Sequence, residues 1–390
     1  AGWRTLSLGK VHHGLGDVDD ELAWSEAPWR PERWQRWYAS EKARAAQAAA
    51  EEAHPVAVRH KVRAVVEDHA SLPGAEFPDG RIADEAIRRI AEHAEGGARA
   101  GEPLFLAVGF LKPHLPFVSP QEYWDLHQGT NRVLQGRTPV GAPAVAVHDS
   151  EEVRAYLDVP DEGPFSAELS SRLVRGYRAC VSFVDAQVGR VLEALEAHGL
   201  AEDAIVVVWG DHGWHFNELG MWAKQTCFEQ ALRVPLIVRA RGIEAREVDS
   251  FVELVDLYPT LAGLAGLEAP GGLDGRDLSG MLLEGGVPAV EIAPRAQYPR
   301  GPVMGRTVRD ETHRYTEWER SGVSEAVELY AARAAVNEER NLAGEAARAR
   351  ELSRMAAPLR RGFGRCAPCP PRFPSRNVSL TVSAVPAPRA

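Results

Sequence analysis

Polar side chains follow three apolar segments of this 390-residue sequence, at the point where each segment ends. Lysine and histidine follow Arg4–Leu8 and Leu104–Phe110, and an Asp-His pair follows Ala204–Trp209. Because ligands of an open α/β sheet bind at the carboxyl ends of its strands, we expect these polar residues to share one site. Each cluster alone is typical of a polar loop, but the convergence of three favours a functional site. The residues concerned are Lys10, His12, His13, Lys112, His114, Asp211 and His212.

Asp211 and His212 form the sharpest of these clusters. An aspartate that leaves an apolar strand loses hydration, so a cation or hydrogen-bond donors must meet its charge. A hard divalent cation would accept the Asp211 oxygen, with His212 as a second ligand or a hydrogen-bond donor. Lys224 follows shortly afterwards, at a distance along the chain that lets a loop return its ammonium to the same place. With Lys10 and Lys112 it would surround a tetrahedral anion with positive charge.

The elements that would position these residues alternate between strands and helices. The apolar segments Arg4–Leu8, Leu104–Phe110, Ala204–Trp209 and Val234–Val238 are predicted strands. Helices are predicted over Glu41–His69, from Asp84 to Ala94, from the N-cap Ser166 to Gly199, and from Asp256 to Leu267. This order predicts an α/β fold with a mostly parallel sheet that helices cover on both faces.

Less regular sequence lies around these elements. Four tryptophans between residues 24 and 37 suit a segment that wraps the surface, and 130–164 is rich in Pro, Gly and Val without a clear period. After Gly271, short segments around Glu291–Ile292, Gly305–Val308 and His313–Trp318 predict antiparallel strands, and Glu325–Tyr330 and a helix to Met355 follow them. We therefore expect a main domain over residues 1–270, a C-terminal subdomain over 271–356 and a disordered tail over 357–390.

Composition narrows the range of partners. Hydrophobic residues make up 45% of the chain and charged residues 26%, as in ordinary globular proteins. The formal net charge of −10 argues against nucleic acid as the main partner, and the apolar runs are too short to span a membrane. Cys180 and Cys227 are isolated and only Cys366 and Cys369 form a Cys-x-x-Cys pair, so neither a disulfide framework nor a closed zinc site is expected.

The same polar segments, taken in order, resemble the sulfatase family. The resemblance rests on Gly9-Lys10-Val11-His12-His13, Lys112-Pro113-His114, Gly210-Asp211-His212-Gly213, Trp222-Ala223-Lys224 and Val255–Leu261. It continues through Arg295–Arg300, Tyr315–Trp318 and Glu328–Tyr330, and so covers most of residues 1–345. The Lys-Pro-His and Asp-His-Gly segments in this order are specific to the family, whereas the Gly-Lys segment alone would be weak.

The resemblance implies an alkaline-phosphatase-like α/β fold with a small C-terminal α+β subdomain, a calcium ion, and hydrolysis of a sulfate ester on a sugar. It implies a secretory, lysosomal or extracellular location. The resemblance also implies roles for residues: Asp211 and His212 match metal ligands of the family. Lys10 and His13 match groups that assist the nucleophile and bind sulfate, and His114 and Lys224 match sulfate-binding or leaving-group positions. Lys112 would hold sulfate, His12 is the alternative to His13, and Trp214 would either wall the sugar pocket or serve in packing.

The family's nucleophile is a formylglycine made from the Cys of a Cys-x-Pro-Ser-Arg motif, and this sequence does not contain that motif. Cys366-Ala367-Pro368 is followed by Cys369 and Pro370, where Ser and Arg should stand. We expect the motif, with an Asp-Asp pair for the metal, to precede Ala1. The 390-residue chain is expected to bind calcium weakly and to be inactive.

Two other functions are compatible with the same residues. One is a sulfatase-like protein that binds sulfated glycans without hydrolysing them. The other is a phosphoester or phosphonate hydrolase of the same superfamily, in which Ser or Thr replaces formylglycine. The Lys112-Pro113-His114 segment argues against the second.

Overall fold

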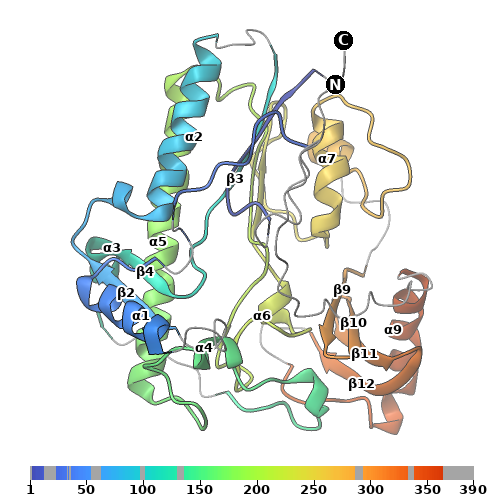
Figure 1. Cartoon of the computed structure of the whole chain (residues 1–390). Coiled ribbons are helices and arrows are strands. Elements are labelled where there is room, and N and C mark those ends of the chain that lie inside the picture. Colours follow the sequence, from blue (N-terminus) through green and yellow to red (C-terminus); the bar gives the residue numbers. More distant parts are fainter. Residues whose placement is uncertain are drawn as a thin grey trace, which may run out of the picture.

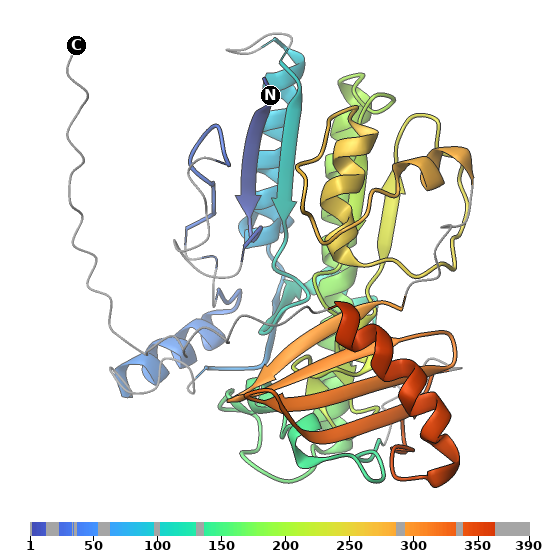
Figure 2. The same cartoon turned by 90° about the vertical axis from the view of Figure 1, so that its right-hand side faces the viewer.

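The computed structural model describes residues 2–12, 23–32, 34, 37–53, 63–96, 102–129, 136–285, 293–332 and 338–362. Figure 1 shows two parts, an α/β part built along the long helices α2 (Pro78–Ala94) and α5 (Ala167–Ala197), and a C-terminal sheet. Helix α9 (Ala349–Gly362) lies on that sheet (Figure 2). The predicted combination of an α/β unit and a small C-terminal α+β unit is therefore present.

Two parallel strands begin the α/β part. Strand β1 (Arg4–Gly9) pairs with β3 (Leu104–Gly109) in a register that aligns Gly9 with Gly109. Helix α2 lies against both strands and contacts α5. Its apolar stripe includes Ile82, Ala86 and Ile90, all buried, so the helix begins at Pro78 and not near Asp84 as predicted.

A second parallel pair lies where the sequence predicted a continuous helix. Helix α1 spans Glu41–Ala53, whereas β2 (Glu67–Ala70) pairs with β4 (Phe117–Pro120), which leads into α3 (Gln121–Asp125). The buried carboxylate of Asp68 accepts hydrogen bonds from the backbone N–H groups of Ala39 and Ser40, at 2.7 and 2.9 Å. This long-range contact and strand pairing outweigh the helical composition of the segment.

Helix α5 follows its sequence signals closely. The Ser166 hydroxyl accepts the backbone N–H of Leu169 at 3.1 Å, and Gly199 adopts a φ of 67° just past the C-terminus. The ring of Phe117 on β4 packs so tightly against Gly176 that an alanine Cβ would lie 2.9 Å from the Phe117 Cβ. Close packing at this point fixes α5 against β4.

The sheet is less parallel and less continuous than predicted. Strand β5 (Val206–Trp209) pairs with β8 (Leu236–Arg239), and this pairing is antiparallel. Within the described residues β3 does not pair with β5, so each of these two strands has one unpaired edge. Large apolar side chains are exposed here: Phe105 on β3, Trp209 on β5 and Ile237 on β8 are 42%, 49% and 63% exposed. Short elements fill the region between β5 and β8: β6 (His215–Phe216), β7 (Trp222–Ala223) and α6 (Glu229–Leu232).

The C-terminal part is a four-stranded antiparallel sheet in the order β12-β11-β10-β9. Its core side chain Trp318 is fully buried and packs with Leu219, Met221 and Tyr330, so the sheet rests on the segment that precedes Lys224. The strands are β9 (Arg295–Arg300), β10 (Val303–Arg309), β11 (His313–Arg320) and β12 (Val323–Ala331), and the helices α7 (Leu257–Leu264) and α8 (Ser279–Glu284) precede them.

The last helix of the C-terminal region extends beyond its predicted end. Helix α9 continues to Gly362 because Met355 and Leu359 are buried against the sheet, so the packed region does not end at residue 356. The strand predicted around Glu291–Ile292 and the remainder of the predicted tail lie outside the described residues. In the described part of the chain, no helix is both long and apolar enough to cross a membrane.

Candidate active site

Lys10 and Asp211 meet beyond the ends of β1 and β5. The Lys10 ammonium donates to the Asp211 carboxylate, with Nζ and Oδ2 3.2 Å apart. Nε2 of His212 lies 3.6 Å from the other carboxylate oxygen, and its Nδ1 lies 2.9 Å from the Gly213 carbonyl oxygen. Two strand ends that are about 200 residues apart in the chain therefore contribute to one cluster, as the polar residues after each strand indicated.

The loop that carries Asp211 is held by close backbone contact. Gly213 donates its N–H to the Ala231 carbonyl at 2.8 Å, and an alanine Cβ at Gly213 would lie 2.0 Å from the carbonyl oxygen of Gln230. A side chain cannot be accommodated there without moving the loop or α6. Glycine is thus required at this position by close approach, and it sets the place of Asp211 and His212.

Glu152 organises a second cluster. It lies on the short helix α4 (Glu151–Arg154), and its Oε1 is 3.2 Å from Nε2 of His114 and 3.3 Å from Nζ of Lys224. The side-chain amide of Gln225 donates to its other oxygen at 2.6 Å. Only 13% of the Glu152 side chain is exposed, so a buried carboxylate connects a residue that follows β3 with one that follows β7.

Lys224 stands between the two clusters. Its ammonium contacts Glu152 and lies 5.8 Å from the centre of the Trp214 ring. Burial lowers the pKa of Lys224, while the charges of Glu152 and Asp211 act in the opposite direction and Lys10 adds to the lowering. The same ammonium acts on both carboxylates, because it also helps to lower the pKa of Asp211.

Both carboxylates are charged at neutral pH. Burial by itself would raise the pKa of Asp211, but His212, Lys10 and Lys224 outweigh it and hold the pKa below its usual value. Burial also works against Glu152, yet its contacts with His114, Lys224 and Gln225 hold its pKa far below the usual range. The site is therefore a chain of alternating charges that runs from Lys10 through Asp211 and Lys224 to Glu152.

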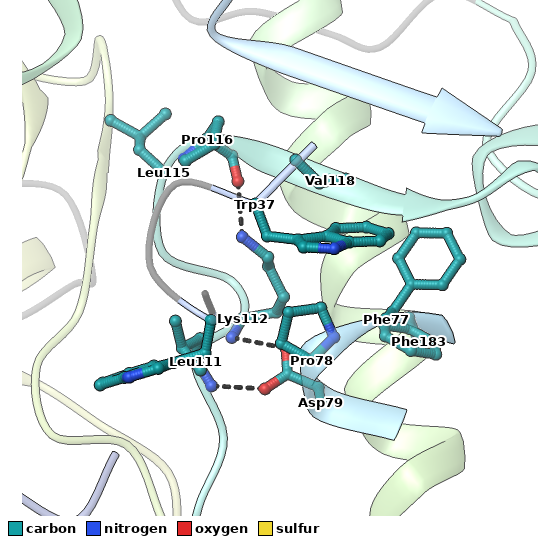
Figure 3. A pocket seen from close by; sticks show the side chains of 11 residues that line it. Trp37, Phe77, Pro78, Asp79, Leu111, Lys112, Leu115, Pro116, Val118 and Phe183 are labelled. Atoms are coloured by element: carbon teal, nitrogen blue, oxygen red, sulfur yellow. Dashed lines mark hydrogen bonds between the residues drawn. The ribbon is translucent and has the colours of Figure 1, made fainter. Parts of the chain in front are cut away.

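Lys112 does not join these clusters. Its ammonium donates to the carbonyl oxygens of His114 and Pro116, at 3.1 and 2.6 Å, and burial lowers its pKa. Figure 3 shows this lysine beside Asp79, whose carboxylate accepts the backbone N–H of Leu111 at 2.7 Å. Both side chains line a cavity of about 20 Å³ beneath Trp37. The ammonium that the sequence assigned to sulfate binding is used to hold the turn that carries His114.

The remaining predicted residues have separate places. Trp214 is 6% exposed and packs edge-on against Phe117, with ring centres 5.9 Å apart, and its place in the wall of a sugar pocket stays a prediction. His12 lies beside Trp24, with ring centres 6.3 Å apart. His13 lies outside the described residues, so the choice between His12 and His13 stays a prediction.

Glu152 is the residue of this site that the sequence did not reveal. It falls in the stretch of Pro, Gly and Val that was taken as an irregular surface segment, and its neighbour Glu151 is equally acidic. No strand end or recurring spacing marks one of the two as buried. The contact with Lys224 depends on a fold that brings together residues 72 positions apart.

The donor set near Asp211 does not form a calcium site by itself. Calcium takes six to eight oxygen ligands, whereas the described residues offer one carboxylate beside one imidazole here. Among the described residues there is no group of three or more His, Cys, Asp or Glu side chains that could hold a metal ion. Asp211 is instead neutralised by Lys10.

The chain is similar in sequence to known proteins. The chain matches the family described as Sulfatase over residues 6–267. It is 33% identical over 308 residues to iduronate 2-sulfatase of Mus musculus, an alignment that covers 69% of this chain and 53% of the relative. The chain thus spans about half the length of that relative.

Two solved structures share the fold. A phosphonate monoester hydrolase of Agrobacterium radiobacter superposes with a TM-score of 0.68 at 21% identity, covering 91% of this chain and 77% of that chain. A protein in complex with its substrate D-glucosamine-2-N,6-O-disulfate superposes with a TM-score of 0.61 at 19% identity, covering 74% of this chain and 69% of that chain. At these identities the likeness establishes the α/β fold alone.

Proposed function

This chain belongs to the sulfatase family, and we propose that it is the larger part of a sulfatase domain that hydrolyses sulfate esters of sugars. The observation that carries the proposal is the arrangement of Lys10, Asp211, Lys224 and His114 around neighbouring loop segments. Three of these side chains are hydrogen-bond donors of the kind that binds sulfate oxygens. The similarity to iduronate 2-sulfatase supports a sugar sulfate as the substrate class.

The proposed reaction breaks the bond between sulfur and the ester oxygen. Lys10 and Lys224 would bind the sulfate oxygens and offset the charge that grows on them in the transition state. As the bond breaks, its electron pair passes to the ester oxygen, which takes a proton from His114 or Lys224 and leaves as an alcohol. Burial lowers the pKa of Lys224 and makes its ammonium a better proton donor.

The attack on sulfur needs a nucleophile that these residues do not include. In the family a formylglycine supplies it, and the sequence has no Cys-x-Pro-Ser-Arg motif from which to make one. We propose that the nucleophile and the further metal ligands come from a segment other than residues 1–390. Asp211 and His212 are the proposed contribution of this chain to a calcium site, and no step above depends on that ion.

The test joins this chain to a segment with the family's nucleophile motif, in a host that makes formylglycine. We expect the joined protein to release sulfate from 2-O-sulfated and 6-O-sulfated sugars, measured as free sulfate. Asp211→Asn and Lys224→Met should each lower kcat/KM by about 10² or more, and Lys42→Met on the exposed face of α1 should not.

Other outcomes of the same experiment would select the alternatives. Preference for phosphonate or phosphate esters would assign the chain to the phosphonate hydrolases, whose fold it shares. Binding of sulfated glycans without sulfate release would identify a glycan-binding protein. Turnover by the 390-residue chain alone, unaffected by Asp211→Asn, would contradict the proposed site.

A further inference from the structure

We infer that Glu152 is a positioning residue, which favours the protonated form of the His114 ring and anchors the Lys224 ammonium beside it. This inference deepens the proposed function and rests on it for the roles of His114 and Lys224. Its geometric basis is one shared oxygen: Oε1 of Glu152 is 3.2 Å from His114 Nε2 and 3.3 Å from Lys224 Nζ. A single carboxylate therefore sets the distance between the two proposed proton donors.

The surroundings of the His114 ring determine its protonation. Nδ1 lies 2.7 Å from the Leu115 carbonyl oxygen, which can only accept a hydrogen bond. Nε2 faces the Glu152 carboxylate, which also only accepts while it is charged. Because a neutral imidazole has one N–H, both hydrogen bonds form together only when the ring carries two protons.

The charged groups that face His114 act in opposite directions. Burial holds the pKa of His114 below its ordinary value and the Lys224 ammonium adds to this lowering, whereas Glu152 and the Leu115 carbonyl act to raise the pKa. The Lys112 ammonium adds a further cation nearby, since it donates to the His114 carbonyl. Glu152 is the one carboxylate that these contacts place against the ring, so its removal would leave burial and the cations unopposed.

Glu152 is held in place from several sides. Gln225 binds its second oxygen at 2.6 Å, and the Gln225 carbonyl in turn accepts a hydrogen bond from the Arg300 guanidinium at 2.6 Å. The residue that precedes α4, Ser150, accepts the backbone N–H of Trp222 at 2.9 Å. Helix α4 is thereby tied to β7, the strand that leads directly into Lys224. These contacts are those of a fixed carboxylate rather than a mobile surface side chain.

The test is an NMR titration of histidine-labelled protein, using the full 390-residue chain. The variant His114→Asn assigns the His114 signals. We expect Glu152→Gln to move the titration midpoint of His114 to lower pH by about one unit or more. The matched control is Glu151→Gln, which removes an exposed carboxylate from the same helix and should leave the midpoint unchanged. Equal midpoints in the wild-type chain and Glu152→Gln would overturn the inference.

A second measurement needs no variant at Glu152. Below the titration midpoint, the Nε2 proton of His114 should exchange with water more slowly than that of the exposed His198, because it is hydrogen-bonded to Glu152. Equal exchange would also overturn the inference. Neither readout requires turnover, so an inactive joined protein would refute the proposed function alone, and an unchanged midpoint would refute the role of Glu152 alone.

Discussion

Lysines that follow strands in this chain serve two different purposes. Lys10 and Lys224 contact carboxylates at the site, whereas the Lys112 ammonium satisfies two backbone carbonyls under Trp37. Both uses place a lysine just beyond a strand, and the sequence pattern is the same for both. The difference lies in which groups surround each ammonium in space.

The structural use of Lys112 has a measurable consequence. Lys112→Met removes the donor to the His114 and Pro116 carbonyls and should lower the free energy of unfolding by about 1–3 kcal/mol, measured by urea denaturation. Lys42→Met, an exposed lysine on α1, is the control and should leave stability unchanged. If Lys112→Met kept full stability but weakened sulfate binding, Lys112 would be assigned to sulfate binding.

At the scale of elements, the loop between β5 and β6 depends on a glycine. Alanine at Gly213 would place its Cβ 2.0 Å from the Gln230 carbonyl oxygen, so Gly213→Ala should destabilise the protein by about 1–3 kcal/mol and displace Asp211. Gly210 begins the same loop, and an alanine Cβ there meets Pro235 at an ordinary 3.4 Å. Gly210→Ala should therefore retain wild-type thermal stability. Equal melting temperatures for the two variants would show that α6 moves to accommodate the added Cβ without loss of stability.

Glu328 in the C-terminal sheet should make the free energy of unfolding depend on pH. Burial raises the pKa of Glu328 on β12 to about 7, although the Trp318 N–H and the Tyr330 hydroxyl both donate to it. Between pH 4.5 and 7 the folded protein holds a proton that the unfolded chain releases, so stability falls as pH rises through this window. The loss amounts to about 3 kcal/mol once Glu328 is charged.

Urea denaturation at pH 5 and pH 8 measures this effect. Glu328→Gln should reduce the difference in unfolding free energy between the two pH values, because amide and carboxyl have similar shapes and only the carboxyl titrates. Glu325→Gln changes a carboxylate on the same strand that pairs with Arg320, and it should keep the wild-type difference. An unchanged difference in Glu328→Gln would assign the pH dependence to another group.

On the scale of the whole molecule, the proposed function makes the chain one part of a larger catalytic arrangement. It spans about half the length of mouse iduronate 2-sulfatase, and within the described residues β3 and β5 keep unpaired edges. One carboxylate beside one imidazole is a poor ligand set for calcium. The molecule therefore positions cations for an anion more completely than it positions ligands for a metal.

Calcium titration by calorimetry measures how weakly this incomplete ligand set binds the ion. The 390-residue chain should bind calcium with a Kd weaker than about 10⁻³ M, and Asp211→Asn should remove the residual binding at this site. Asp203→Asn, which changes an exposed aspartate paired with Arg241, is the control and should have no effect. Tight calcium binding that survives Asp211→Asn would show that the ion binds elsewhere in the chain.

The sequence by itself determined which segments are apolar strands, where helix α5 starts and ends, and that polar residues follow β1, β3 and β5. These features arise from local patterns, because periodicity, caps and turn residues act over a few positions. Local patterns also misled, since the segment predicted as one helix over Glu41–His69 leads into strand β2, which pairs with β4.

Only the tertiary structure decided which polar residues meet. It separated Lys112 from Lys224, brought Glu152 to His114, and set β5 antiparallel to β8. Each of these outcomes depends on burial and on contacts between residues far apart in the chain, and the free energy of such contacts is not encoded in the neighbouring residues. The sequence therefore identified the hydrogen-bond donors of the site. The packing of α4 against β7 placed the Glu152 carboxylate against two of these donors, His114 and Lys224.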